Sequence, residues 1–158
     1  MEKFDLVGKP IPDLNLPDTR GGTTNLRTFI GRRIVILILL KGVAWGVWKK
    51  LVTDFASAFE QLKKHNVELY PITTSDTLEQ ARELETKYAR GKYPIYCDQE
   101  KQIFKVLPQD WTRYMADKIP AIFIIDKKGI VRQSFYKDHT KELPKIEEVL
   151  ELIDKFAK

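Results

Sequence analysis

Hydrophobic and polar positions follow two different periods along the chain, one typical of strands and one typical of helices. Ile34 to Leu40 is an unbroken run of β-branched and leucine residues. Such a run predicts a strand that is covered on both faces in a largely parallel sheet. Strands are also predicted over 67–73, 94–97, 121–126 and 130–135, the last two joined by the turn Lys127-Lys128-Gly129.

Three segments space their apolar residues three and four positions apart, and each predicts an amphipathic helix. The first extends from Trp48 to about His65 and Asn66, with a stripe at Trp48, Leu51, Val52, Phe55, Phe59 and Leu62. The last covers the C-terminus, with a stripe at Leu143, Ile146, Val149, Leu150, Ile153 and Phe156.

The middle helix is predicted to open at Asp76, which is followed by Glu79 as in an N-terminal cap pair. Gly91 is its predicted stop. Its buried stripe is Leu78, Ala81, Leu84 and Tyr88, with Glu83 and Glu85 on the solvent side.

The N-terminal segment and the stretch after Cys97 predict less regular structure. Pro10, Pro12 and Pro17 exclude a helix, and Gly21-Gly22 predicts a hairpin between short strands near Leu14 and Thr24. A brief helix is expected over 99–107, followed over 108–118 by a loop that carries Trp111.

Composition narrows the class of protein. The 158 residues are 43% hydrophobic and 31% charged, which excludes a disordered or fibrous chain and predicts one globular domain spanning 1–158. The expected fold class is α/β, with a central mixed sheet flanked by helices. The longest apolar run is too short for a bilayer span of roughly 20 residues, and no signal peptide pattern opens the chain. We therefore expect a cytoplasmic protein with no membrane partner.

Lys and Arg number 27 against 22 Asp and Glu, a net charge of +5. The basic residues occur as scattered pairs: Arg32-Arg33, Lys49-Lys50, Lys63-Lys64 and Lys127-Lys128. Solvated faces explain such pairs more simply than a nucleic-acid stripe does. Nucleic acid is therefore not an expected partner.

Cysteine and histidine are too few for metal or dithiol chemistry. Cys97 is the only cysteine, so an intrachain disulfide is excluded, and His65 and His139 are the only histidines. A Cys/His zinc site is very hard to assemble from these residues. We expect no metal and no cofactor, with both histidines exposed rather than acting as ligands.

Four local strings, in order and at fitting distances, resemble the AhpC/TSA, peroxiredoxin-like branch of the thioredoxin superfamily. They are G-x-x-x-P-D at 8–13, D-x-x-G at 18–21, L-x-x-x-x-G at 26–31 and P-x-x-F-x-I-D-x-x-G at 120–129. The resemblance covers nearly the whole chain from about Val7. It implies a thioredoxin-like fold with an N-terminal β-hairpin extension.

By this resemblance the active site lies where the first long strand meets the first long helix, because a helix N-terminus stabilises a thiolate there. The C-x-x-C site of thioredoxin-like members falls on Trp45-Gly46-Val47-Trp48, and the P-x-x-x-T-x-x-C site of peroxiredoxins falls on Lys41, Trp45 and Trp48. A frame shifted by one residue uses Gly46 and Lys49. None of these alignments supplies a cysteine, although Pro120 matches the family's cis-proline.

Indole cannot replace a thiolate as nucleophile. The favoured hypothesis is therefore a redox-inactive protein that acts by binding. Trp48 is expected to fill core volume, whereas Trp45, Trp111, Ile119 and Pro120 are expected to form an apolar groove for a protein segment or a small ligand. The backbone amides of Gly46 to Trp48, with Lys41 and Lys49, are a further candidate for anion capture, unless Trp45 or water satisfies them.

Two alternatives stay open. The chain is an antioxidant thiol peroxidase or thiol-disulfide oxidoreductase if Cys97 is the nucleophile, although the neighbouring Asp98 would raise the pKa of its thiol. Approach by Arg90, Lys92 or Arg113 would counter that effect. The remaining alternative is a structural role, such as pairing with a catalytic homologue, and the resemblance also implies a homodimer.

Overall fold

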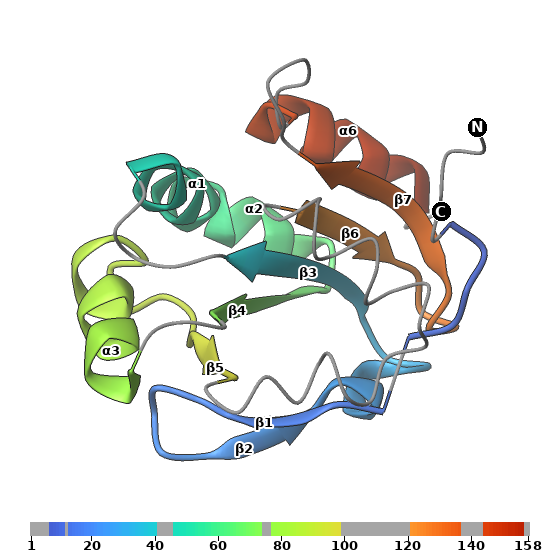
Figure 1. Cartoon of the computed structure of the whole chain (residues 1–158). Helices are drawn as coiled ribbons and strands as arrows, with labels where there is room; N and C mark the ends of the chain where they lie inside the picture. Colours follow the sequence, from blue (N-terminus) through green and yellow to red (C-terminus); the bar gives the residue numbers. More distant parts are fainter. Residues whose placement is uncertain are drawn as a thin grey trace, which may run out of the picture.

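The computed structural model describes residues 7–11, 13–40, 46–73, 77–98, 121–136 and 144–156, and at 40, 46–48, 121 and 136 it describes the backbone only. Two sheets and the surrounding helices make up this part of the chain (Figure 1). In chain order the elements are β1 (Asn15–Pro17), β2 (Thr23–Asn25), a 3-10 helix η1 (Leu26–Phe29), β3 (Ile34–Leu40), α1 (Gly46–Ser57), α2 (Phe59–Lys64), β4 (Val67–Thr73), α3 (Leu78–Lys87), β5 (Tyr96–Cys97), β6 (Ala121–Ile125), β7 (Val131–Tyr136) and α6 (Ile146–Phe156).

The larger sheet has five strands in the order β5-β4-β3-β6-β7. Strands β3, β4 and β5 are parallel to one another, whereas β6 is antiparallel to both β3 and β7. The predicted mixed α/β sheet with a separate N-terminal hairpin is therefore confirmed. The hairpin is β1 and β2, which pair antiparallel with Leu16 opposite Thr24.

The central strand β3 is covered on both faces, as its unbroken apolar run predicts. Ile34, Ile36 and Ile38 pack in one core cluster with residues of α1, α2, α3 and α6. The alternate residues Val35, Leu37 and Leu39 pack in a second cluster with the N-terminal segment, including Leu14 and Leu16. Figure 1 shows α1, α2 and α6 on one side of the sheet and the hairpin on the other.

The first predicted helix is interrupted once. Ala58 separates α1 from α2 and has φ −95° and ψ 2°. The Ala58 amide still donates to Asp54 (3.2 Å), and the Leu62 amide donates to the Ala58 carbonyl (3.0 Å). The hydrophobic stripe therefore continues across the break, and the predicted end near His65 and Asn66 is confirmed.

The middle helix begins one residue later than predicted and ends a few residues before the predicted stop. The N-cap of α3 is Thr77 instead of Asp76, in a capping box with Gln80 instead of Glu79. Two capping patterns overlap in the sequence, Asp76 with Glu79 and Thr77 with Gln80. The structure uses the second pattern, in which the Thr77 hydroxyl and the Gln80 side-chain amide form the cap. The helix ends at Lys87, before Gly91, which has φ 70° and whose amide donates to the Glu85 carbonyl at 3.1 Å.

A third correction concerns Glu85, which was expected on the solvent side of α3. Only 13% of its side chain is exposed, because it points toward the hairpin turn. At the C-terminus, α6 buries Val149 and Ile153 as predicted. The predicted helix over 99–107, the loop over 108–118 and Leu143 lie outside the described residues.

No helix in the ranges that the structure describes is long and apolar enough to cross a membrane.

Candidate functional site

Three parallel strands end in one row, and this row defines the candidate site. Leu40 at the end of β3 is opposite Thr73 at the end of β4, and Thr73 is opposite Cys97 at the end of β5. Ligand sites of open α/β sheets lie at this carboxyl edge, because the following helices begin there. The antiparallel strand β6 begins at the same edge, with Ala121 opposite Leu39.

The residues predicted for the former active site fall only partly in the described chain. Gly46, Val47 and Trp48 form the first turn of α1, of which the backbone alone is described. Trp45, Trp111, Ile119 and Pro120 lie outside the described residues. The structure therefore describes the edge at which these residues were expected, because β3 ends there and β6 begins there. The groove itself stays a prediction.

Two buried polar residues lie at this edge. From the sequence, Asp98 was considered only as a neighbour of Cys97, and Thr73 was not singled out. Thr73 is 0% exposed and Asp98 is 1% exposed. The Asp98 amide donates to the Thr73 carbonyl at 2.8 Å, which joins the ends of β4 and β5. Their position was a usable signal, since a polar residue at the end of a predicted parallel strand lies at the edge where sites form.

Cys97 lies at the end of β5 with 4% of its surface exposed. Because side chains alternate along a strand, Tyr96 contacts the N-terminal segment while Cys97 packs in the cluster that contains Val52 and Leu84. A buried thiol has to become exposed before it meets a peroxide or a disulfide. Its row in the sheet nevertheless places it at the candidate edge.

Lys49 is exposed near the start of α1, next to Lys50, which pairs with Asp54 at 2.7 Å. The Lys49 Nζ lies 5.6 Å from the centroid of the Tyr88 ring at the end of α3, a cation–π contact. The contact links two helices beside the candidate edge. Lys41, its predicted partner in anion capture, lies outside the described residues.

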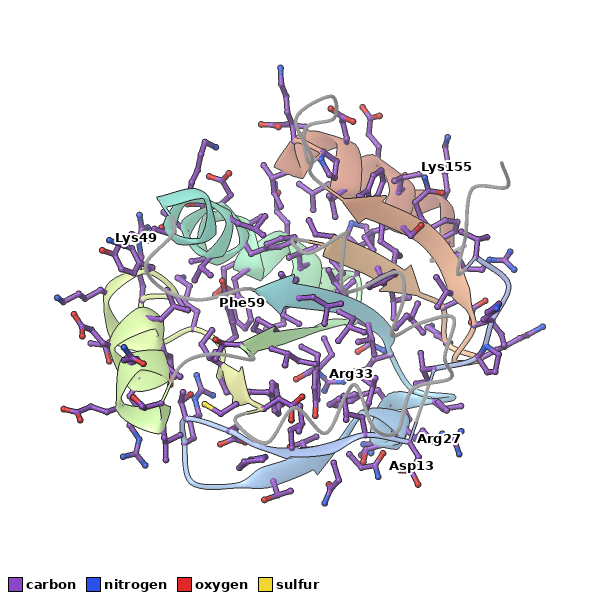
Figure 2. The ribbon with its side chains drawn as sticks, viewed as in Figure 1. Asp13, Arg27, Arg33, Lys49, Phe59 and Lys155 are labelled. Atoms are coloured by element: carbon purple, nitrogen blue, oxygen red, sulfur yellow. The ribbon has the colours of Figure 1, made fainter. Side chains whose placement is uncertain are left out.

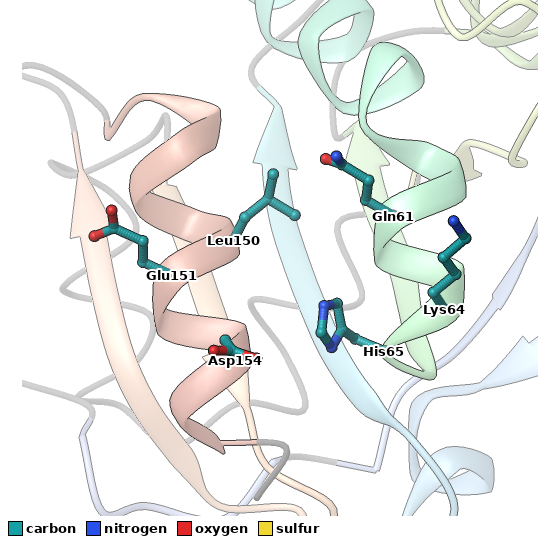
Figure 3. A pocket seen from close by; sticks show the side chains of 6 residues that line it. All are labelled: Gln61, Lys64, His65, Leu150, Glu151 and Asp154. Carbon is teal, nitrogen blue, oxygen red and sulfur yellow. The ribbon is translucent and has the colours of Figure 1, made fainter.

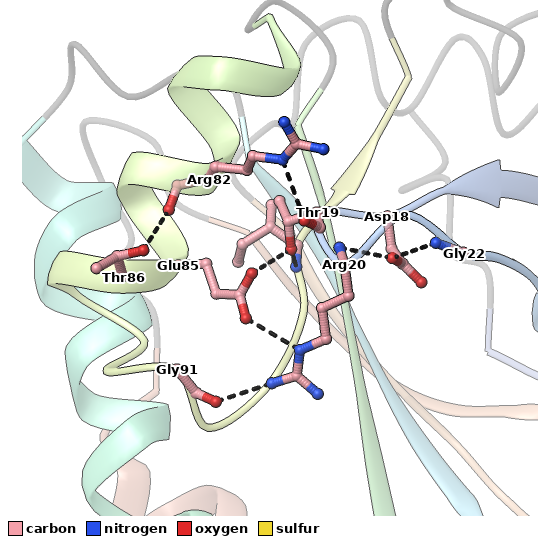
Figure 4. A network of polar contacts seen from close by, with 9 residues as sticks. Asp18, Thr19, Arg20, Gly22, Arg82, Glu85, Thr86 and Gly91 are labelled. Atoms are coloured by element: carbon pink, nitrogen blue, oxygen red, sulfur yellow. Dashed lines mark hydrogen bonds and ion pairs between the residues drawn. The ribbon is translucent and has the colours of Figure 1, made fainter.

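A polar network fastens the hairpin turn to α3 and to the edge strand β5 (Figure 4). The Thr19 hydroxyl donates to Glu85 and accepts from the Ile95 amide at 3.1 Å, and the Thr19 amide donates to the Ile95 carbonyl at 3.0 Å. Arg20 pairs with Glu85 at 3.0 Å and donates to the Gly91 carbonyl at 2.8 Å. The network thereby holds the chain just before Cys97.

The same region contains two stacked tyrosines. The rings of Tyr70 and Tyr96 are 3.7 Å apart and inclined by 8°, and the Tyr70 hydroxyl donates to the Thr24 carbonyl at 2.7 Å. Burial raises the pKa of Tyr96 to about 12 and raises the pKa of Tyr70 further. Both phenols are therefore neutral at physiological pH, which fits a structural role under the hairpin.

A shallow hollow of about 460 Å³ lies away from this edge, between α2 and α6 (Figure 3). His65 is half-buried there rather than exposed as predicted, and His139 lies outside the described residues. Among the described residues, no group of three or more His, Cys, Asp and Glu side chains is arranged to hold a metal ion. The residues that line the hollow are Gln61, Lys64, His65, Leu150, Glu151 and Asp154.

The mixed five-stranded sheet, its N-terminal hairpin and the edge where β3 meets α1 define a thioredoxin-like α/β protein. The AhpC/TSA family model matches residues 7–134, and the chain belongs to this family.

Relatives and solved structures agree with this assignment. The thiol-disulfide oxidoreductase ResA of Bacillus thuringiensis is 26% identical over 156 residues, covering 96% of this chain and 80% of that protein. The chloroplastic 2-cysteine peroxiredoxin of Chattonella marina is 25% identical over 139 residues, covering 81% and 69%. The fold is similar to that of the reduced 2-Cys peroxiredoxin of Plasmodium vivax, with a TM-score of 0.75, 21% identity and coverage of 95% and 81%.

Proposed function

We propose that this chain is a peroxiredoxin- and thioredoxin-like protein that has lost the redox-active cysteines and acts by binding. One observation carries the proposal: the sole cysteine, Cys97, is at the end of β5 and buried in the core, and no cysteine occurs where β3 leads into α1. Attack on a peroxide or a disulfide needs an accessible thiolate. A site without an accessible thiolate still has a shape and backbone hydrogen-bonding groups that can bind a ligand.

The proposed ligand is an extended protein segment or a small apolar molecule, bound in a groove formed by Trp45, Trp111, Ile119 and Pro120. Support comes from the start of β6 at Ala121, beside the end of β3, because the backbone just before this strand is where thioredoxin-like proteins pair an extended segment through hydrogen bonds. Large aromatic side chains add affinity in a groove of this kind.

The test of the groove is a binding screen of the purified protein against an array of extended apolar peptides, followed by titration of the hits. We expect Trp45→Ala and Trp111→Ala each to weaken the hits by about tenfold or more. Ile30→Ser, which removes an exposed apolar side chain far from this edge, is the matched control and should leave affinity unchanged. Equal affinity in the wild type and both tryptophan variants would refute the groove.

A second candidate function rests on the position of Cys97 in the same row as Thr73 and Leu40. A thiol at the carboxyl edge of the sheet becomes a nucleophile if β5 moves enough to expose it. In that case the protein is a one-cysteine peroxidase or a thiol-disulfide oxidoreductase, and Cys97→Ser abolishes turnover. The binding function does not depend on this residue.

The oligomeric state distinguishes a structural role from the binding and enzymatic functions. A structural role predicts that the protein co-purifies with a catalytic homologue or forms a homodimer. Sedimentation equilibrium of the purified chain tests the homodimer directly, and co-purification from the native cell tests the pairing with a homologue.

A further inference from the structure

Basic residues that are far apart in the sequence come together where β3 begins. The segments 7–13, 25–33 and 126–132 contain seven Lys and Arg residues and two Asp residues. The three segments therefore have a net charge of +5, equal to that of the whole chain. Figure 2 shows Arg27 and Arg33 at this end and Lys49 near the opposite end of β3.

Backbone contacts hold the three segments side by side. The Gly31 amide donates to the Lys127 carbonyl at 2.5 Å, and the Ile11 amide donates to the Gly129 carbonyl at 2.9 Å. The Arg27 guanidinium lies 3.5 Å from the Ile11 carbonyl oxygen. Two of the four scattered basic pairs, Arg32-Arg33 and Lys127-Lys128, thereby share one surface.

Four of these cations are available to a partner. Arg27, Arg32, Lys127 and Lys128 are all exposed, and in the described part of the chain none of the four forms an ion pair. The other two exposed or half-exposed arginines of this region are paired, Arg33 with Glu68 at 2.7 Å and Arg132 with Asp126 at 3.6 Å. We call the four together with Ile30 the cationic end.

Ile30 gives this surface an apolar centre. It is 41% exposed, and only Val7, at 43%, is a comparably exposed large hydrophobic residue in the described ranges. A Cβ atom at Gly129 would meet the Ile30 side chain at 2.9 Å, so Ile30 lies directly on the turn that carries Lys127 and Lys128. Gly129 also has φ 82°, which favours glycine. The lack of a side chain at Gly129 is what lets Ile30 pack on this turn.

We propose that the cationic end is a docking surface for an anionic lipid bilayer. Exposed Lys and Arg are attracted to the negative surface potential of such a bilayer, and an exposed aliphatic side chain among them gains by entering the headgroup region. Nucleic acid fits less well, because an aliphatic centre offers nothing to phosphates and the patch lacks an exposed aromatic side chain for stacking on bases. This proposal departs from the expectation of no membrane partner, which rested on the lack of a membrane-spanning apolar run and of a signal peptide and did not consider docking by surface charge.

Docking in this orientation leaves the candidate site free. β3 begins at the cationic end and finishes at the candidate edge, and its seven residues span roughly 20 Å. The edge therefore faces away from the bilayer when the cationic end is bound, and binding at the two surfaces should be independent.

The test is co-sedimentation of the full chain with vesicles of phosphatidylcholine alone and of phosphatidylcholine with phosphatidylserine, at low and at physiological salt. We expect binding to the anionic vesicles only, weakened by salt. Lys127→Gln with Lys128→Gln should lower the affinity by about thirtyfold. Lys63→Gln with Lys64→Gln removes two exposed lysines from α2 and should change nothing.

Ile30→Ser separates a bilayer from other polyanions. It should weaken vesicle binding by about fivefold or more, because the aliphatic side chain no longer enters the headgroup region. Circular dichroism checks that each variant is folded. The proposal is overturned by no binding to anionic vesicles, by equal losses in the two lysine double variants, or by vesicle binding that Ile30→Ser leaves intact. Tighter binding to a DNA duplex or to an acidic peptide than to the vesicles would assign the surface to that partner instead.

Discussion

Thr19 shows how much a single side chain contributes to the position of β5. Its hydroxyl is bonded on both sides, to the Glu85 carboxylate and to the Ile95 amide. Thr19 is 6% exposed, so water cannot readily take over these bonds. The network of Asp18 to Gly22 with α3 therefore depends on this residue.

Thr19→Val keeps the size of the side chain and removes the hydroxyl. We expect the free energy of unfolding to fall by about 1–3 kcal/mol, because the Ile95 amide loses one partner in a buried site. Thr86→Val is the control, since the exposed Thr86 hydroxyl only donates to the Arg82 carbonyl at 2.9 Å, and its cost should stay under about 0.5 kcal/mol. Urea denaturation measures both. Equal costs would mean that the Thr19 hydroxyl has no special role.

The titration of a single side chain, Tyr96, makes the stability of the fold depend on pH. Burial raises the pKa of this phenol to about 12, whereas in the unfolded chain it ionises near its usual value of about 10. Its contribution to stability is therefore complete below about pH 10 and is lost as the pH rises toward about 12. Burial raises the pKa values of Tyr70 and Tyr93 as well, so they act in the same direction.

Denaturation across this alkaline range should show a falling free energy of unfolding, and Tyr96→Phe should show a shallower fall. The substitution keeps the stacked ring and removes one of the titrating groups. An unchanged slope in Tyr96→Phe would show that this phenol is not protected in the folded state.

At the scale of elements, hydrophobic patterning was sufficient to predict β3, β4, β6 and β7 and the helices α1 to α3 and α6, whereas the ends of these elements required tertiary information. The stripe of the first helix continues through Ala58, so periodicity alone does not reveal the interruption there. Glu85 was predicted to face the solvent because helical periodicity takes account of α3 alone. Its partners Thr19 and Arg20 belong to the hairpin, more than 60 residues away in sequence.

The cap of α3 gives a direct test at this scale. Thr77→Ala removes the hydroxyl that accepts from the Gln80 amide at 3.1 Å, and we expect it to cost about 1 kcal/mol of stability. Thr77→Ser keeps the cap and should cost much less. Glu79→Gln tests the cap predicted from the sequence and should be nearly neutral. Thermal denaturation of the three variants measures these differences in stability. A larger loss of stability in Glu79→Gln than in Thr77→Ala would contradict the observed cap.

At the scale of the whole molecule, the order of elements together with four short motifs was enough to predict the family and the fold. The edge of the candidate site followed from topology, because parallel strands end together. The burial of Thr73 and Asp98 was not predicted, because it depends on neighbouring strands. The cationic end was missed for a related reason, since contacts between residues about 100 positions apart bring its basic pairs together.

The two surfaces lie at opposite ends of β3 and make different demands on the chain. The candidate edge depends on Leu40, Thr73 and Cys97 being in one row, whereas the cationic end depends on turns at the other end of the sheet. Substitutions at one end should therefore leave the other unaffected. The claim that the protein is redox-inactive is tested most directly at Cys97, the only cysteine of the chain.

The most direct measurement is consumption of hydrogen peroxide and of an organic hydroperoxide by the reduced protein with a thiol reductant, comparing the wild type with Cys97→Ser. A protein that has lost its redox site predicts no turnover in either form. Turnover by the wild type that disappears in Cys97→Ser would contradict the account and make Cys97 a nucleophile at the carboxyl edge of the sheet.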